Sequence, residues 1–317
     1  MNAILKSVSD LVLELNKTPL KHLALIENIV AKLTAHINEK ENLTISEIEK
    51  CVGYLIKYTV ITPIPIPLNS SMPLIRAVQY DEVAGNGYSN VSRISYIPYD
   101  SGITPKLGRM NKKGQSLFYA CLGEQPNSIS TMLSECRAKV GDIFNILHCE
   151  TNKDYEDPDK RFSPALYMLP IGINEYFRKN QSDPFGVNQD YSDIYDCIHK
   201  NASPEISNAF HISDKFLTDV LSRTETGKLY EVTSVISDEC LQNDKIDGVI
   251  YPSTQLLEHP NMALKTTSVD SKVIYVKTSS VRVTESNSGN YHTVENLNYG
   301  VIKSDKIVWL NTAPLIG

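Results

Sequence analysis

Two glycines enclose a short polar loop near the middle of the chain. Residues 108–114 read Gly-Arg-Met-Asn-Lys-Lys-Gly. Gly108 and Gly114 can adopt backbone conformations that a Cβ atom disfavours, which would let the loop approach a ligand closely. The planar guanidinium of Arg109 suits a phosphate or a carboxylate, and Asn111 adds an amide. The loop is therefore a candidate site for an anionic ligand.

Four further polar residues stand within or at the ends of expected strands and helices. Tyr119 lies in a short apolar and aromatic run, and Glu135 stands at the far end of an expected helix. The run at 246–253 is typical of a buried strand that stops at a proline and leaves Ser253 at its end. Asn261 opens the next apolar run. A carboxylate, hydroxyls and an amide are thus available to a polar ligand.

An arginine lies inside another apolar run. Arg76 is near the middle of residues 73–80, which we expect to form a strand. An arginine in such a place either extends to the edge of the sheet or meets an anion. Periodicity alone favours the first, structural role.

Composition is that of an ordinary soluble globular protein. Of the 317 residues, 41% are hydrophobic and 21% charged, and the net charge of −6 argues against a surface that wraps nucleic acid. No apolar run approaches the roughly 20 residues that cross a bilayer, and the N-terminus lacks the pattern of a signal peptide. We expect a cytoplasmic protein that binds neither nucleic acid nor membrane.

The cysteines and histidines show no metal-ligand spacing. The six cysteines include no CxxC pair, and the seven histidines include no HExxH motif. We therefore expect buried thiols and no metal site.

The first 60 residues are expected to be helical. Apolar residues recur at three- and four-residue spacing over 5–15 and 23–33, which is typical of one helix face. A third helix is expected after Thr44, where the residues at 44–47 fit a capping box. Because apolar helix faces must be buried, we expect a homo-oligomer through residues 1–60, with packing on the second domain as the alternative.

A proline-rich connector ends this region. Prolines alternate with apolar residues over 61–67, which excludes a helix and makes the segment stiff. We therefore expect two domains, a helical one at residues 1–70 and a second one at residues 71–317. The turn-rich residues 81–107 suit a mobile flap over a cleft.

The second domain is expected to be α+β, because strand and helix patterns are mixed along it. Its expected strands lie at 73–80, 143–147, 229–233, 246–253, 261–264, 273–276 and 301–310, the last as a pair. A short helix is expected at 235–241, and another is expected to begin after Ser213, which would be its N-cap.

Taken in chain order, these motifs resemble the RES-domain family, named for an arginine, a glutamate and a serine. The similar segments are Leu74-Ile75-Arg76-Ala77, Gly108-Arg109-Met110-Asn111 with Gly114, Phe118-Tyr119-Ala120, Ser134-Glu135-Cys136, and Tyr251-Pro252-Ser253 with Asn261. The resemblance covers about residues 73–283. Glu124 competes with Glu135 for the glutamate, and Arg93 competes with Arg76 for the arginine.

The resemblance implies an ADP-ribosyltransferase-like core that degrades NAD, as a toxin held by an antitoxin or another regulatory protein. Glu135 would stabilise the cation that develops on the ribose when nicotinamide departs. Arg76 and Arg109 would bind the pyrophosphate. Tyr119 would stack on nicotinamide or hydrogen-bond the ribose, and Ser253 would hold a ribose hydroxyl. The remaining substrate contacts would come from Gly108, Asn111, Gly114, Tyr251 and Asn261.

NAD would be a substrate and no cofactor would be needed, because no GxGxxG fingerprint opens a βαβ unit. Water and phosphate both remain possible acceptors. Two other readings stay open: ADP-ribosyl transfer to a protein, and a catalytically inactive RES-like binding module.

Overall fold

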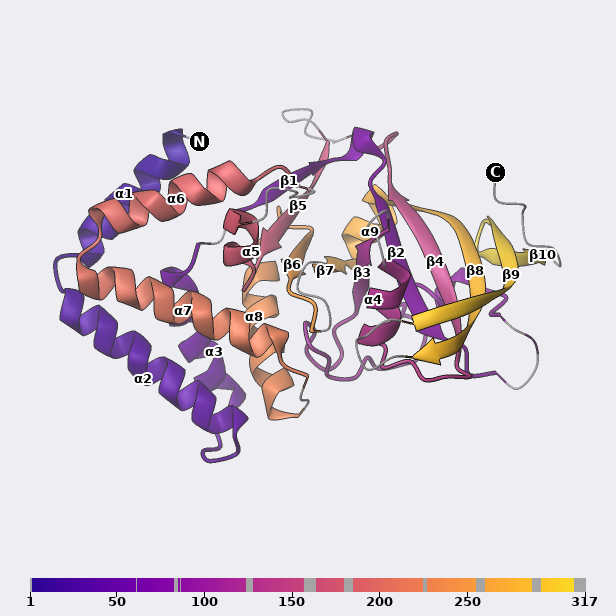
Figure 1. Cartoon of the computed structure of the whole chain (residues 1–317), viewed down its shortest axis with the longest axis horizontal. Coiled ribbons are helices and arrows are strands. Elements are labelled where there is room, and N and C mark those ends of the chain that lie inside the picture. Colours follow the sequence, from indigo (N-terminus) through magenta and orange to yellow (C-terminus); the bar gives the residue numbers. More distant parts are fainter. Residues whose placement is uncertain are drawn as a thin grey trace. The chain divides into compact units, whose positions relative to one another are not determined.

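The chain forms an α+β fold with a large mixed sheet (Figure 1). This computed structural model describes residues 2–60, 62–82, 85, 87–123, 128–156, 164–179, 185–224, 227–254, 260–286 and 292–310. Two compact parts are present: a helical part (residues 1–64, 106–113 and 168–251) and a sheet part (residues 65–105, 114–167 and 252–317). The chain passes from one part to the other within strands β1 (Ile64–Pro67) and β5 (Ala165–Pro170), and again near residues 106, 114 and 252.

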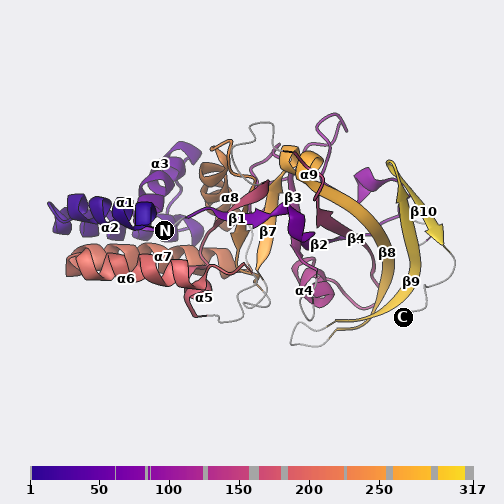
Figure 2. The ribbon, with the colours of Figure 1, turned by 90° about the horizontal axis from the view of Figure 1, so that it is seen from above.

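The helical part is built from two sets of helices that come from distant segments of the chain. Its elements are α1 (Asn2–Leu15), α2 (Pro19–Ile37), α3 (Ile45–Leu55), the 3-10 helix η1 (Ile56–Tyr58), α5 (Asn174–Lys179), α6 (Asn188–Asn201), α7 (Pro204–Ser222), α8 (Lys228–Leu241) and strand β6 (Gly248–Tyr251). Helix α1 packs against α6, α2 against α7, and α3 against α8 (Figures 1 and 2). The apolar faces of α2 and α3 are thus largely covered by other helices of the same chain, whereas Leu11 and Leu13 of α1 stay exposed.

The predicted start of α3 is confirmed. Thr44 and Glu47 form the predicted capping box, in which the hydroxyl of Thr44 accepts from the backbone N–H of Glu47 and the carboxylate accepts from the backbone N–H of Thr44. Pro19 occupies the first turn of α2. Thr18 stands at the N-cap position, but its hydroxyl contacts the ring of His22 and makes no capping hydrogen bond.

Two expectations for residues 213–241 are wrong. Residues 229–233, predicted as a strand, are helical; together with the helix predicted at 235–241, which is confirmed, they form the continuous helix α8. Ser213, expected as an N-cap, lies fully buried inside α7, which begins after Ser203. Ser203 is the residue whose hydroxyl accepts from the N–H of Ile206.

The sheet part is an antiparallel sheet with two helices packed on it. Its elements are η2 (Leu68–Ser70), β2 (Pro73–Gln79), η3 (Val91–Arg93), β3 (Leu117–Leu122), α4 (Ser128–Glu135), β4 (Ile143–Thr151), β7 (Asn261–Lys265), α9 (Thr266–Lys272), β8 (Val273–Ser286), β9 (His292–Lys303) and β10 (Lys306–Leu310). The strand order within this part is β7-β3-β2-β4-β8-β9-β10, and every neighbouring pair is antiparallel. The predicted strands near 73, 143, 261, 273 and 307 are confirmed.

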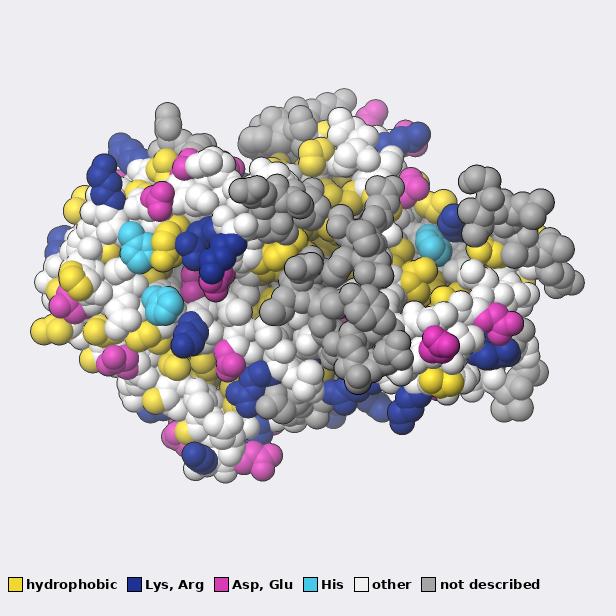
Figure 3. All heavy atoms as spheres, in the orientation of Figure 1, with side chains coloured by type: hydrophobic (Ala, Val, Ile, Leu, Met, Phe, Trp, Pro, Cys, Tyr) yellow, Lys and Arg dark blue, Asp and Glu magenta, His cyan; other side chains and the backbone are white. Residues whose placement is uncertain are grey.

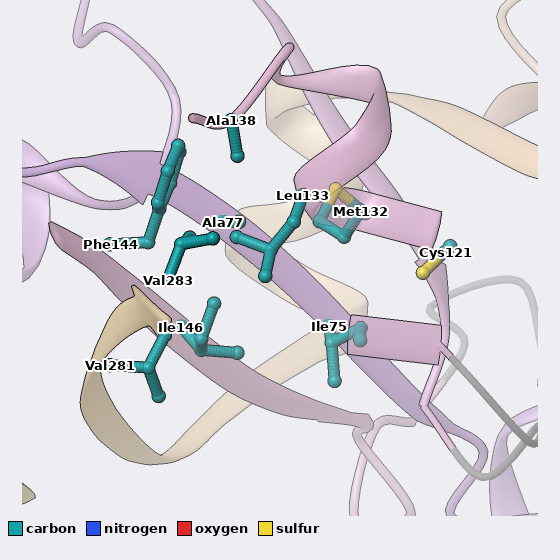
Figure 4. Close-up of a cluster of buried hydrophobic side chains, with 10 residues drawn as sticks. All are labelled: Ile75, Ala77, Cys121, Met132, Leu133, Ala138, Phe144, Ile146, Val281 and Val283. Carbon is teal, nitrogen blue, oxygen red and sulfur yellow. The ribbon is translucent and has the colours of Figure 1, made fainter. Parts of the chain in front are cut away.

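Helix α4 is held by a cluster of buried apolar side chains (Figure 4). Met132 and Leu133 of α4 meet Ile75 and Ala77 of β2, with Phe144 of β4 in the same cluster. Since Ile75 and Ala77 alternate with Arg76, the cluster defines one face of the sheet, which we call the α4 face. Figure 2 shows β8 and β9 curving strongly at the far end of this part.

Residues 88–95 are not a free flap. Tyr88, Val91 and Ile94 are buried, and the backbone N–H of Val91 donates to the carbonyl of Asp305. The indole N–H of Trp309 donates to the carbonyl of Tyr88 at 2.9 Å. The expectation of a mobile flap over 81–107 therefore does not hold for this stretch.

The observed division also differs from a single boundary near residue 70. Residues 1–64 belong to the same compact part as residues 168–251. The physical reason is the packing of α1, α2 and α3 on α6, α7 and α8, which sequence periodicity cannot reveal because it does not name the partner of an apolar face.

Candidate active site

Glu135 is the last residue of α4, and the end of this helix is fixed by its backbone. The N–H of Ala138 donates to the carbonyl of Leu133, and the N–H of Arg137 donates to that of Ser134, which is a Schellman motif. Arg137 takes the left-handed conformation that this motif requires, with φ of 55°. Leu133 and Ala138 both lie in the apolar cluster under the helix. The position of Glu135 is thus set by packing and by the helix end.

One oxygen of the Glu135 carboxylate collects four hydrogen bonds. Its Oε1 accepts from the hydroxyl of Ser253 at 2.7 Å and from the side-chain amide of Asn261 at 2.9 Å. It also accepts from the backbone N–H of Thr254 at 2.8 Å and from the hydroxyl of Thr254 at 3.3 Å. Within the described residues, Oε2 accepts none. The carboxylate is therefore held through one oxygen while the other stays available.

Two of the three donor residues are buried, and the carboxylate is partly exposed. Ser253 is 0% exposed and Asn261 is 3% exposed, whereas Glu135 has intermediate exposure. Burial, and then the nearby Glu135 carboxylate, raise the pKa of the Cys121 thiol. Cys121 lies opposite Asn261 in the register of β3 and β7, which places Glu135 over these two strands. A partly exposed carboxylate with a buried supporting shell is a common arrangement of a catalytic group.

Three of the expected site residues, Glu135, Ser253 and Asn261, are thus brought together. Sequence reasoning missed Thr254, although a hydroxyl directly after Ser253 was a visible signal. A backbone donor such as the N–H of Thr254 leaves no trace in residue type.

Tyr119 lies on the same face of the sheet as this cluster. Strand β3 alternates, so Tyr119 and Cys121 share one face, and Cys121 belongs to the apolar cluster on the α4 face. Tyr119 is opposite Ala263, two residues along β7 from Asn261. Its side chain is partly exposed, while the other residues of β3 are buried. Its position fits a residue that contacts a ligand on this face.

Arg76 lies on the opposite face. Its neighbours Ile75 and Ala77 face α4, so Arg76 points the other way, where it lies over the ring of Phe118. Its Nε donates to the carbonyls of Ile94 and Ser95 at 3.2 and 3.1 Å, and its Nη1 donates to the carbonyl of Tyr119 at 3.0 Å. Burial lowers the pKa of the Arg76 guanidinium. The structure therefore ties Arg76 to backbone carbonyls and does not bring it into the Glu135 cluster.

Arg93, the alternative arginine, is on the surface of the sheet part. It forms ion pairs with Asp81 and Glu82 at 3.3 and 3.2 Å and lies over the ring of Tyr88. Glu124, the alternative glutamate, lies outside the described residues.

The loop at 106–113 belongs to the helical part, where Arg109 lies at the end of α7. Its Nη1 donates to the carbonyls of Leu221 and Arg223, both at 2.9 Å, and its guanidinium lies near the ring of Tyr230. A cation at this position is favourable because helix C-termini carry unpaired carbonyls. Within the described residues, Nε and Nη2 of Arg109 make no hydrogen bond.

The amide of Asn111 closes the loop on itself. Its Nδ2 donates to the backbone carbonyls of Lys106 and Lys112 at 2.8 and 3.0 Å. The backbone carbonyl of Asn111 accepts from the backbone N–H of Gly108. Tyr251 ends β6, also in the helical part, and is buried. These residues are placed to shape the loop and strand end.

Gly114 follows in the sheet part and has the positive φ that its residue type suggested. Its φ is +86°, and no atom lies within 4 Å of where a Cβ would stand. It lines a pocket of about 560 Å³ together with Tyr96 and Asp270, whose side chains hydrogen-bond each other. The backbone conformation, and not a close contact, requires glycine here.

The described part of the chain shows neither a metal-binding cluster nor a membrane-spanning helix. No group of three or more His, Cys, Asp or Glu side chains there is arranged to hold a metal ion. No helix among the described residues is long and apolar enough to cross a membrane. All six cysteines are free thiols. Comparisons with protein-family models, with curated proteins and with solved structures found no match for this chain.

Proposed function

We propose that the protein consumes NAD by cleaving the bond between nicotinamide and ribose, with water or phosphate as acceptor. The observation that carries this proposal is the Glu135 carboxylate, held through Oε1 by Ser253, Thr254 and Asn261 with Oε2 available. The choice of NAD as the substrate rests on the order of the RES-like motifs along the chain. An ADP-ribosyltransferase-like arrangement of the sheet part belongs to the same proposal.

Cleavage of the nicotinamide–ribose bond requires mainly one carboxylate beside the ribose. The pyridinium of NAD is already positive, so nicotinamide leaves as a neutral molecule and needs no strong general acid. The ribose develops an oxocarbenium-like charge, which a carboxylate oxygen beside the anomeric carbon stabilises. The Oε2 atom of Glu135 would take this role and also orient the incoming oxygen nucleophile. The four hydrogen bonds to Oε1 would fix the carboxylate before the substrate arrives, which lowers the cost of reorganisation.

The other residues are assigned by their surroundings. Tyr119, partly exposed on the same face, would contact the nicotinamide or the ribose. Ser253 donates its hydroxyl proton to Glu135, so we assign it to positioning this carboxylate and not to nucleophilic attack. Arg76 would act by holding residues 94–95 against the sheet.

In a cell, an enzyme of this kind would arrest growth as a toxin or a defence effector. A RES-like toxin would then be restrained by an antitoxin or by another regulatory protein. The resemblance alone supports this biological role.

The test is release of nicotinamide from NAD by the purified protein, with and without phosphate. We expect Glu135→Gln to lower the rate by about 10²-fold or more, as removal of a key electrostatic group does. Glu285→Gln is the matched control, because Glu285 is an exposed carboxylate of β8 in the same part. Nicotinamide release by Glu135→Gln at the rate of the control would remove Glu135 from the mechanism and direct attention to Glu124.

The fate of the ADP-ribose separates the reaction types. With NAD labelled in the adenosine half, label that stays in small molecules supports hydrolysis or phosphorolysis. Label that appears on proteins of a cell lysate would instead assign the protein as an ADP-ribosyltransferase. No turnover under any of these conditions would favour the inactive binding module.

A further inference from the structure

A second pocket lies in the helical part, between α5, α6 and α7. It has a volume of about 630 Å³, within the range of small-molecule sites. Figure 3 shows histidine, basic and acidic side chains gathered over these helices. The walls include Phe210 and Ile198, which are buried, and the ring of Tyr195. All lining residues belong to the helical part, so this pocket is separate from the Glu135 cluster.

The pocket is built by a close approach that only glycine permits. Gly172 precedes α5 with φ of +63°, and a Cβ there would lie 2.8 Å from the backbone carbonyl oxygen of Leu217 in α7. The chain entering α5 thus lies directly against α7, which places Asn174 beside Asp214.

Acceptor atoms without donors lie on the inner side of this pocket. Oδ1 of Asp214 accepts from the hydroxyl of Thr59 and, at 3.0 Å, from the side-chain amide of Asn174. Within the described residues, Oδ2 of Asp214 has no hydrogen-bond partner. Oδ1 of Asn174 is also buried without a partner, and Asn174 is only 6% exposed. Burial raises the pKa of Asp214, although the hydrogen bonds from Thr59 and Asn174 and the nearby Arg178 and His211 act to lower it. A ligand group with several N–H donors and a positive charge would satisfy both acceptors.

Cationic groups without a carboxylate partner lie in the same pocket. The guanidinium of Arg178 stacks on the ring of Tyr195, with its Cζ 3.6 Å from the ring centroid. In the part of the chain that the structure describes, neither Arg178 nor Lys215 forms an ion pair, whereas Lys179 is paired with Glu175 and Arg223 with Asp219. Arg178 is close enough to Asp214 to influence the pKa of its carboxyl group. A carboxylate on the ligand would meet the planar fork of Arg178.

We propose that this pocket binds a free α-amino acid with a bulky side chain. The ammonium group would bind Asp214 and Asn174, the carboxylate would bind Arg178 with help from Lys215, and the side chain would lie against Phe210, Ile198 and Tyr195. A zwitterion is the simplest ligand that carries both charges a short distance apart. The pocket would thus give the helical part a sensor for a metabolite, independent of the proposed NAD chemistry.

The experiment is a binding measurement on the full chain without NAD. Each of the twenty amino acids is tested by thermal unfolding and then by calorimetric titration. We expect at least one bulky amino acid to raise the unfolding midpoint by about 3 °C or more at a hundred-fold excess over its Kd. Its N-acetyl derivative and its amide should give no rise, because each lacks one of the two charges.

Variants then assign the site. Arg178→Gln and Asp214→Asn should each weaken binding at least about 10-fold, as loss of a charge-assisted hydrogen bond does. Asp214→Asn keeps an oxygen that accepts from Thr59 and Asn174. In the absence of ligand, the unfolding midpoint of this variant should therefore equal or exceed that of the unaltered protein. Asp196→Asn, at an exposed position of α6 outside the pocket, is the matched control and should bind normally.

Three results would overturn the proposal. These are the absence of binding by all twenty amino acids, unchanged binding by both pocket variants, and a response to AMP or GMP with none to amino acids. The last result would make the pocket a nucleotide site. Circular dichroism of each variant shows whether it is folded, and the partly exposed Arg178 provides a test that does not disturb the buried network.

Discussion

At the scale of single residues, the hydrogen bonds to Glu135 are unequal. The hydroxyl of Ser253 is 2.7 Å from Oε1, whereas the hydroxyl of Thr254 is 3.3 Å away. Thr254 also supplies its backbone N–H at 2.8 Å, which no change of side chain removes. The cluster therefore contains its own strong and weak donors to one atom.

This inequality predicts different effects of two conservative substitutions. Ser253→Ala removes a buried hydrogen bond to a charged group, so we expect kcat/KM for nicotinamide release to fall by about 10- to 100-fold. Thr254→Val keeps shape and the N–H and should lower it by less than about 3-fold. The measurement is the initial rate at several NAD concentrations for both variants. Equal losses would show that the hydroxyl of Ser253 has no special role in positioning Glu135.

At the scale of elements, the end of α4 decides where Glu135 stands. Its Schellman motif places Arg137 at φ of 55°, a conformation that costs a residue with a Cβ about 1 kcal/mol or more. The helix end is thus maintained against a local preference, by the apolar contact of Leu133 and Ala138 in the core cluster.

Glycine at position 137 should relieve this strain. We expect the free energy of unfolding of Arg137→Gly to be about 1 kcal/mol higher than that of Arg137→Ala. Both variants lack the arginine side chain, and only glycine adopts positive φ freely. Denaturant unfolding of the two variants, followed by fluorescence of the sheet part, provides the comparison. If Arg137→Ala is equally stable or more stable, the helix end does not depend on this backbone conformation.

The elements also show how far sequence patterns reach. Strands such as β4 and β7 were predictable because their apolar runs are short and bounded by turns. The first part of α8 was mistaken for a strand because residues 229–233 read Leu-Tyr-Glu-Val-Thr, a local run favourable to a strand. Most of α8 is buried, so it lacks the alternation of apolar and polar residues that marks a surface helix. Tertiary burial overrode local propensity there.

The same limit applies to the candidate site. The motifs and the family resemblance named Glu135, Ser253 and Asn261, and the structure places them within hydrogen-bond distance. They could not show that Arg76 faces away from α4, because the face of a strand residue depends on which side the helix packs. The carbonyls that hold Arg76 and Arg109 are likewise invisible in a sequence.

At the scale of the whole molecule, the helical part is built from segments that are far apart in the sequence. Residues 1–64 pack with residues 168–251, and most of the sheet part lies between them in sequence. The N-terminal helices therefore have a partner within the chain, and their apolar faces do not by themselves require a second copy.

Removal of residues 1–60 should unfold the helical part. The buried apolar side chains lost with α2 and α3 are Ile26, Ile29, Leu33, Ile37, Ile48, Val52 and Leu55. At about 1.5–3 kcal/mol each, their burial contributes on the order of 10 kcal/mol, which is comparable to the whole stability of a domain. The surfaces of α7 and α8 that they cover would be exposed, so we expect the shortened chain to aggregate.

Light scattering after size-exclusion chromatography measures this outcome, and co-expression of residues 1–60 as a separate chain is the control. The added segment should restore solubility, because it returns the missing apolar faces to α6, α7 and α8. A different result would favour the homo-oligomer through residues 1–60. In that case the full chain would be a dimer, and the shortened chain would be a soluble monomer with the helix content of α5 to α8 intact. Mass and circular dichroism together distinguish the two, since unfolding lowers helix content and simple dissociation does not.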